Sequence, residues 1–163
     1  MIFTEKELED ILKQGENSSV EFKSASVRPE VFAREMVAFV NSNGGVILLG
    51  VSDSGDLEGL DLAKNYEEWT MNIARHNVSP ALTVQYEELE IQGKKIGVIS
   101  IEKGKDKPYQ TGDHYFIRIG STNRKATQAE LLRLYQAAGV FHYYFDRKRR
   151  SQCGRGTSFR DQS

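Results

Sequence analysis

The first residues suited to catalysis or metal binding occur in the segment 15–23, where acidic and basic residues are close in sequence. Glu21 and Lys23 are two positions apart, so a strand places both on one face, and Glu16 precedes them in a loop. Two carboxylates can hold Mg²⁺ or Mn²⁺ against a phosphodiester, and an adjacent lysine can stabilise the developing charge. A solvated strand edge with alternating Glu and Lys has the same pattern. The spacing alone therefore leaves a metal-dependent site and an ordinary strand edge both open.

A further acidic candidate, Asp53, follows the apolar run 46–51. A residue just past the carboxyl end of a buried strand is at a usual place for a functional group on an α/β scaffold. The alternative is a turn aspartate that accepts hydrogen bonds from nearby backbone amides. Before the run, Gly44 and Gly45 permit a close approach between a helix and the strand.

Basic residues in the second half of the chain could contact phosphate. Arg124 and Lys125 stand just before an expected helix N-terminus, where backbone amides attract anions. A phosphate-binding surface and a solvated basic loop both fit this pattern. The candidate nucleic-acid contacts are Lys103, Lys105, Lys107, Arg118, Ser121, Arg124 and Lys125.

The elements that must position these residues can be predicted from hydrophobic period and capping signals. Thr4 with Glu7, and Thr127 with Glu130, form capping boxes at the starts of two helices. The alternation from 82 to 98 predicts an antiparallel hairpin. The fold class is α+β, a mixed or antiparallel sheet packed by three to four helices. We expect helices at 5–14, 29–42, 65–77 and from 127, with strands at 19–24, 46–51, 57–60 and 114–119 as well as the hairpin.

Composition excludes several classes of protein. Hydrophobic residues make up 39% of the 163 residues, which is enough for a core. The longest apolar run is too short for a bilayer, which requires ~20 residues, so we expect no membrane partner. A single cysteine excludes an internal disulfide, and the sequence lacks P-loop and G-x-S-x-G motifs. The N-terminus has no signal-peptide core, so we expect a cytoplasmic protein.

Charge is distributed unevenly along the chain. Residues 142–163 hold six Lys and Arg against two Asp, a net charge of +4, while the rest of the chain carries −5. We expect one domain over 1–145 and a basic, flexible tail over 146–163. A mildly acidic body with basic segments is compatible with nucleic-acid contact through local patches.

Three segments together, 15–23, 39–55 and 115–121, resemble the Schlafen-type AlbA-like domain, a family long labelled as DNA-binding or divergent AAA in bacteria and archaea. The resemblance covers about residues 1–145. It implies a curved sheet that binds nucleic acid, usually beside a winged-helix or other C-terminal module. In the Schlafen nucleases, three acidic residues cut RNA with a divalent cation, and Glu16, Glu21 and Asp53 match those positions here. Their nuclease clamp has two lobes, and a homodimer could supply the second one.

These observations lead to two main functional predictions. The first is a nucleic-acid-binding module of a prokaryotic regulator-type protein, which contacts DNA or RNA phosphates through the basic loop and requires no cofactor. The alternative is a metal-dependent endoribonuclease with Mg²⁺ or Mn²⁺, in which Glu16, Glu21 and Asp53 hold the metal and Lys23 stabilises charge. A plain interaction module is also compatible with the fold. The sequence leaves open whether the chain is an enzyme.

Overall fold

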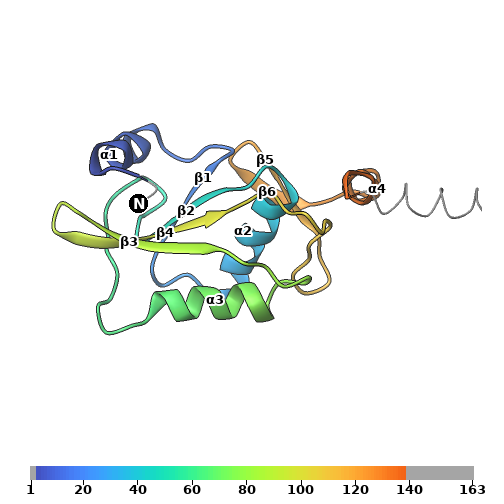
Figure 1. Ribbon diagram of the computed structural model, residues 1–163. Helices are drawn as coiled ribbons and strands as arrows, with labels where there is room; N and C mark the ends of the chain where they lie inside the picture. Colours follow the sequence, from blue (N-terminus) through green and yellow to red (C-terminus); the bar gives the residue numbers. More distant parts are fainter. Residues whose placement is uncertain (1–2, 139–163) are drawn as a thin grey trace, which may run out of the picture.

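A four-stranded mixed sheet lies at the centre of the fold, with helices packed on both of its faces (Figure 1). The computed structural model describes residues 3–138. The helices are α1 (Glu5–Gln14), α2 (Pro29–Asn41), α3 (Tyr66–His76) and α4 (Gln128–Ala137). The strands are β1 (Val20–Lys23), β2 (Gly45–Leu49), β3 (Gln85–Ile91), β4 (Lys94–Ile101), β5 (Phe116–Ile119) and β6 (Thr122–Lys125).

The sheet has the strand order β1-β2-β4-β3. Strands β1 and β2 run parallel because α2 connects them, while β4 runs antiparallel to both β2 and β3. Strands β5 and β6 form a separate antiparallel hairpin. The main sheet is therefore mixed, with a single parallel pair at the β1 edge.

Each face of the main sheet has its own apolar core. On one face, α2 and α3 pack against β2 and β4 residues such as Ile47. On the other face, α1 contributes Leu8, which packs with Phe22 of β1. Neighbouring residues of a strand point to opposite faces, so the position of Phe22 places Glu21 and Lys23 on the α2 face.

The end of α2 attaches the β5–β6 hairpin and the preceding loop to the body. The side-chain amide of Asn41 donates to the carbonyl oxygens of Tyr109 and Phe116, at 2.8 and 2.9 Å, and its oxygen accepts from the Tyr109 N–H at 2.7 Å. The next residue, Ser42, accepts a hydrogen bond from the backbone N–H of Arg118 at 3.1 Å. One helix end thus holds two segments that are distant in the sequence.

Helix α4 begins at the predicted capping box of Thr127 and Glu130. None of its residues is buried within the described part of the chain, and Leu132 and Tyr135 are exposed. Figure 1 shows α4 beyond the β5–β6 hairpin, to one side of the main sheet. Among residues 3–138, the buried core is therefore formed without this helix.

The predicted α+β class, with a mixed sheet and four helices, is confirmed. The close approach at the predicted glycine pair is also present: Gly44 has φ +75°, and a β-carbon at Gly45 would meet the ring of Phe39 in α2. The expected strand 57–60 is wrong, because only a single bridge joins Val51 to Leu57. Strand β6 was not predicted.

The expected end of the domain at 145 and the expected tail over 146–163 lie outside the described residues. Within residues 3–138, no helix has the length and apolar character needed to span a membrane.

Candidate functional site

A cluster of opposite charges lies between β1, α2 and the β5–β6 hairpin. It comprises Glu21, Lys23, Glu35, Arg118 and Asn123, and we call it the charge cluster. The Lys23 ammonium lies 3.2 Å from a carboxylate oxygen of each glutamate. The Arg118 guanidinium lies 2.9 Å from Glu21 and 3.7 Å from Glu35. Two cations thus face two carboxylates, and their formal charges cancel.

Arg118 is the centre of this cluster and is only 6% exposed. Its guanidinium donates to the carbonyl oxygens of Asn17, at 2.6 Å, and Val20, at 3.0 Å. It also donates to the side chain of Asn123 at 3.0 Å and lies 4.4 Å from the centre of the Phe39 ring. Because these partners surround the guanidinium, Arg118 joins the hairpin to β1 and is not available to a phosphate in solution.

Burial and neighbouring charge shift the acid–base properties of the cluster. Burial raises the pKa of Glu35 above 4.5, and the charge of Glu21 adds to the rise. Burial alone would lower the pKa of Lys23, but the charges of Glu35 and Glu21 outweigh it and raise the pKa above 10.5. Lys23 therefore stays protonated. The positive charges of Lys23 and Arg118 stabilise the cluster, because the two buried carboxylates would otherwise repel each other.

Glu16 lies beside the charge cluster, as the sequence predicts for a neighbour of Glu21. Its carboxylate accepts a hydrogen bond from the backbone N–H of Phe22 at 3.0 Å. Partial burial raises the pKa of Glu16 from 4.5 to about 7, and its contact with Glu21 contributes to that rise. The two carboxylates of Glu16 and Glu21 therefore repel each other when both are charged, and protonation of Glu16 removes this repulsion.

The residues predicted as metal ligands do not fit a metal ion in this arrangement. Among residues 3–138, no group of three or more His, Cys, Asp and Glu side chains is placed to hold one. The two oxygens of Glu21 already contact Lys23 and Arg118. Asp53 is exposed in the turn after β2. The structure thus brings Glu16 and Glu21 together, without Asp53 as a third ligand.

The predicted nucleic-acid contacts fall into two groups: residues that are buried or ion-paired, and the remaining residues, which are exposed. Lys107 is buried and donates to the carbonyl oxygen of Ser42 at 3.0 Å; burial, together with the charge of Lys103, lowers its pKa. Arg124 pairs with Glu130 at 2.6 Å at the start of α4, and Arg118 belongs to the charge cluster. The exposed members of the predicted set, apart from the paired Arg124, are Lys103, Lys105, Ser121 and Lys125.

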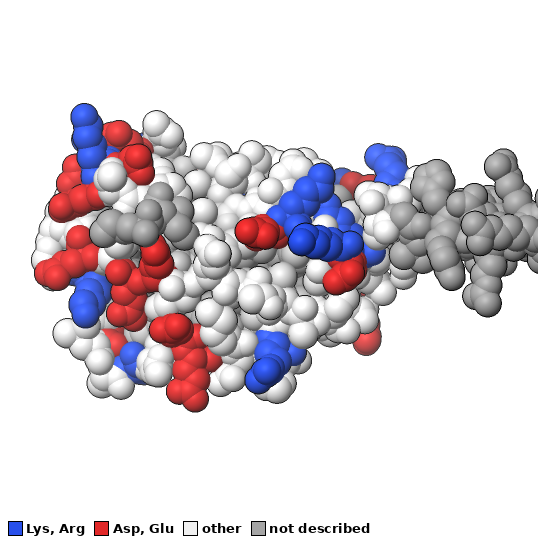
Figure 2. All heavy atoms as spheres, in the orientation of Figure 1, with Lys and Arg blue, Asp and Glu red and all other residues white. Residues whose placement is uncertain are grey.

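The surface carries its charges in two regions. Figure 2 shows Lys and Arg side chains gathered beside the β5–β6 hairpin, together with a few acidic ones. Asp and Glu predominate at the opposite end of this face, around α1 and β3. The net charge of −1 therefore conceals a local basic region.

Sequence reasoning missed Glu35 and Asn123 as members of the charge cluster. A signal for Glu35 exists, because it lies three residues after Phe32 and four before Phe39, on the buried face of α2. A charged residue on such a face requires a partner of opposite charge. No comparable signal marks Asn123, which lies in the unpredicted strand β6.

Two solved structures share the fold of this chain. The DIP2311 protein from Corynebacterium diphtheriae matches with a TM-score of 0.56 and 21% identity, over 74% of this chain and 24% of that chain. The N-terminal domain of a protein from Nitrosomonas europaea, named as an ATP-dependent DNA helicase RecG-related protein, matches with a TM-score of 0.53 and 23% identity, over 77% and 95% of the two chains. At these identities the likeness shows the fold alone, an open α+β domain.

The family can be stated more narrowly. The family model described as Schlafen, AlbA_2 matches residues 16–127, which is well over half of the chain. The protein therefore belongs to the Schlafen AlbA_2 family, and the resemblance expected from the three sequence segments is confirmed. The match ends where α4 begins. A search of curated proteins gives no match to this chain.

Proposed function

We propose that this domain binds nucleic acid through phosphate contacts on the side formed by the β5–β6 hairpin and the loop 102–109. Membership of the Schlafen AlbA_2 family supports a nucleic-acid-associated role, and one fold neighbour is the N-terminal domain of a DNA helicase-related protein. Our finer proposal is a binding module of a prokaryotic regulator. Such binding to DNA or RNA needs no cofactor, because Lys and Arg neutralise phosphate directly.

The observation that carries this proposal is the attachment of two cation-bearing segments to the same helix end. Asn41 bonds the backbone of Tyr109, at the end of the loop with Lys103 and Lys105, and that of Phe116 in β5. Phe116 is paired with Lys125 of β6 across the hairpin. The exposed lysines are therefore carried by two segments that are fixed at one helix end, and the buried Arg118 holds the hairpin against β1.

The test compares binding by two double variants over a range of salt concentrations. In Lys103→Ala/Lys105→Ala, two exposed cations of the proposed surface are removed. In the matched control, Lys6→Ala/Lys13→Ala, two exposed lysines of α1 are removed. Fluorescence anisotropy with labelled single-stranded RNA, single-stranded DNA and duplex DNA gives the affinity and its salt dependence.

We expect the loop variant to weaken binding to all sequences about equally. Its log–log salt slope should flatten by about 0.7 per lost contact on single strands and about 0.9 on duplex DNA. The α1 control should bind as the wild type does. Equal behaviour of the two variants would place the contact surface elsewhere, and absence of salt-dependent binding by the wild type would refute the function.

A metal-dependent ribonuclease is a second proposal, favoured by the close pair of Glu16 and Glu21. The occupied oxygens of Glu21 and the exposed position of Asp53 count against it. The measurement is cleavage of single-stranded RNA with Mg²⁺ or Mn²⁺, by the wild type and by Glu21→Gln, at a temperature where both are folded. Cleavage that depends on both the cation and Glu21 would support a nuclease; no cleavage with any divalent cation would leave binding as the function.

A further inference from the structure

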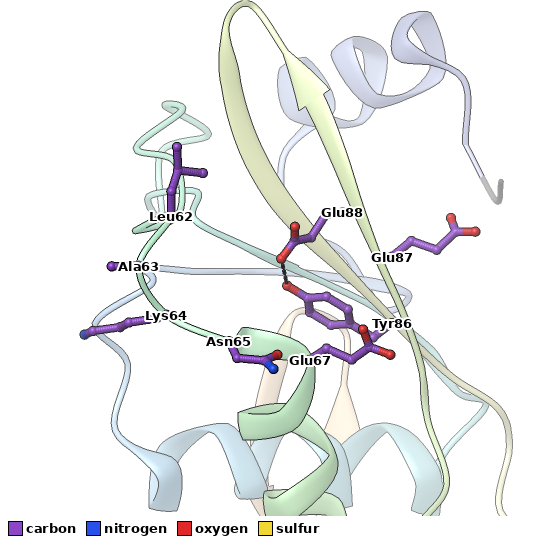
Figure 3. A pocket seen from close by; sticks show the side chains of 8 residues that line it. All are labelled: Leu62, Ala63, Lys64, Asn65, Glu67, Tyr86, Glu87 and Glu88. Carbon is purple, nitrogen blue, oxygen red and sulfur yellow. Dashed lines mark hydrogen bonds between the residues drawn. The ribbon is translucent and has the colours of Figure 1, made fainter.

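Two adjoining hollows lie away from the charge cluster, near the N-terminus of α3. The first, of about 370 Å³, is formed by the turn that follows β1 and by α3, with Val27, Tyr66 and Trp69 among its walls. The second, of about 460 Å³, lies between the residues that precede α3 and strand β3 (Figure 3). Lys64 and Asn65 border both hollows, so the two are continuous along the surface.

The first hollow has an aromatic wall that the core holds in place. The half-buried ring of Trp69 lies 4.9 Å from the buried ring of Phe32, and Tyr66 meets it edge-on at 6.5 Å. Ala25 and Val27 complete the apolar lining and pack against the same core. An aromatic or other apolar side chain of a ligand would pack best against such a wall. Each Å² of apolar surface removed from water contributes roughly 25 cal/mol to the binding free energy.

The second hollow is acidic. Figure 3 shows Glu67 and Glu88 on either side of the Tyr86 ring, with Lys64 directed away from them. The Tyr86 hydroxyl donates to Glu88 at 2.9 Å, and burial together with the charges of Glu88 and Glu67 raises the pKa of Tyr86. Glu87 also lines this hollow. A ligand here needs positive charge, which a nucleic-acid phosphate does not supply.

Together, the hollows require a segment with aromatic residues followed by cations. The chain contains one in residues 143–150, Tyr-Tyr-Phe-Asp-Arg-Lys-Arg-Arg, within a stretch whose net charge of +4 opposes the acidic remainder. Its start is close in sequence to the end of α4, which Figure 1 shows at the side of the molecule opposite the N-terminus of α3. A segment that begins shortly after α4 would have to turn back across the molecule to reach the hollows, so a second molecule supplies it more readily than the same one.

We propose that residues 143–150 of a second copy of this chain dock on the two hollows, with the aromatic residues against Trp69 and the cations beside Glu67 and Glu88. The structure offers a direct reporter, because Trp69 is the only tryptophan in the chain. Quenching of its fluorescence by acrylamide measures whether the first hollow is covered. The assay contains no nucleic acid, so it can fail independently of the proposed function.

The experiment uses two full-length variants. The reporter chain keeps Trp69 and carries Tyr143→Ser, Tyr144→Ser and Phe145→Ser; the donor chain keeps its tail and carries Trp69→Phe. Adding donor should protect Trp69 of the reporter from acrylamide, with half of the effect when the concentration of donor with an undocked tail equals the dissociation constant. Added salt should weaken this protection, because the acidic hollow lies at the surface.

Two controls make the result decisive. A donor that also carries Arg155→Glu and Arg160→Glu, basic residues outside the segment, should protect almost as well. A reporter that also carries Glu67→Gln and Glu88→Gln should lose most of the protection, although its fold is unchanged because both residues are exposed. No protection by the donor would overturn the proposal. So would a wild-type chain whose Trp69 is better protected than that of the reporter alone, by the same amount at every dilution, since that result indicates docking within one molecule.

Discussion

The charge cluster predicts a large and specific effect of replacing Arg118 with methionine. Methionine is long and apolar, so Arg118→Met keeps much of the contact with Phe39 while it removes the guanidinium. Glu21 and Glu35, which are 6% and 7% exposed, then remain with Lys23 as their single cationic partner in the cluster. The cluster changes from neutral to a net charge of −1 in a buried setting.

The expected cost follows from this uncompensated charge. Removing one partner from a buried ion pair costs about 3–5 kcal/mol, because the remaining charge stays desolvated. The carbonyl oxygens of Asn17 and Val20 also lose their donor, which adds to the same penalty. For a chain of this size, such a loss lowers the melting temperature by roughly 10 °C.

The assay is urea unfolding at neutral pH, with Arg133→Met as the control, since Arg133 is an exposed arginine of α4. The double variant Arg118→Met/Glu21→Gln should be more stable than Arg118→Met, because only the neutral pair of Lys23 and Glu35 remains. The reasoning is refuted if Arg118→Met costs less than about 1 kcal/mol, the level of a surface ion pair. It is also refuted if the added Glu21→Gln brings no recovery.

Two further predictions concern other residues of the site. Because the folded protein raises the pKa of Glu16 from 4.5 to about 7, the folded state binds more protons in that window, and wild-type stability should fall relative to Glu16→Gln as pH rises from 4.5 to 7. Parallel curves of the urea midpoint against pH for the two proteins would contradict this. Asn41→Ala removes three hydrogen bonds to the backbone of Tyr109 and Phe116, so it should cost about 3 kcal/mol in urea unfolding. A loss below about 1 kcal/mol would show that the hairpin is attached by other contacts.

Much of the fold could be predicted because its signals are local. The capping boxes at Thr4 and Thr127 stand where α1 and α4 begin, and the alternation around Gln92 gives the β3–β4 hairpin. Strand β6 was missed because its residues, Thr122–Lys125, are mostly polar and exposed, so they show no apolar alternation. This strand forms because the preceding turn brings it beside β5, and a hydrophobic period within the strand itself does not indicate such a pairing.

The charge cluster was only half predictable. A strand period of two places Glu21 and Lys23 on one face, and the structure confirms that they touch. Arg118 was predicted as a phosphate contact, yet it is buried against Glu21 and Glu35. Strand alternation shows that a side chain points away from its apolar neighbours; it does not show which distant element covers that face.

The Arg118 contacts have a kinetic consequence. The arginine donates to the carbonyl oxygen of Asn17, 101 residues earlier in the chain, so this bond closes a long loop within the described residues. Closing so long a loop is entropically costly, and contacts of this kind form late in folding. We therefore expect Arg118→Met to speed unfolding while it leaves the folding rate nearly unchanged, which the two arms of a chevron plot measure separately. On this expectation, the contacts of Arg118 set how long the native state lasts before it unfolds.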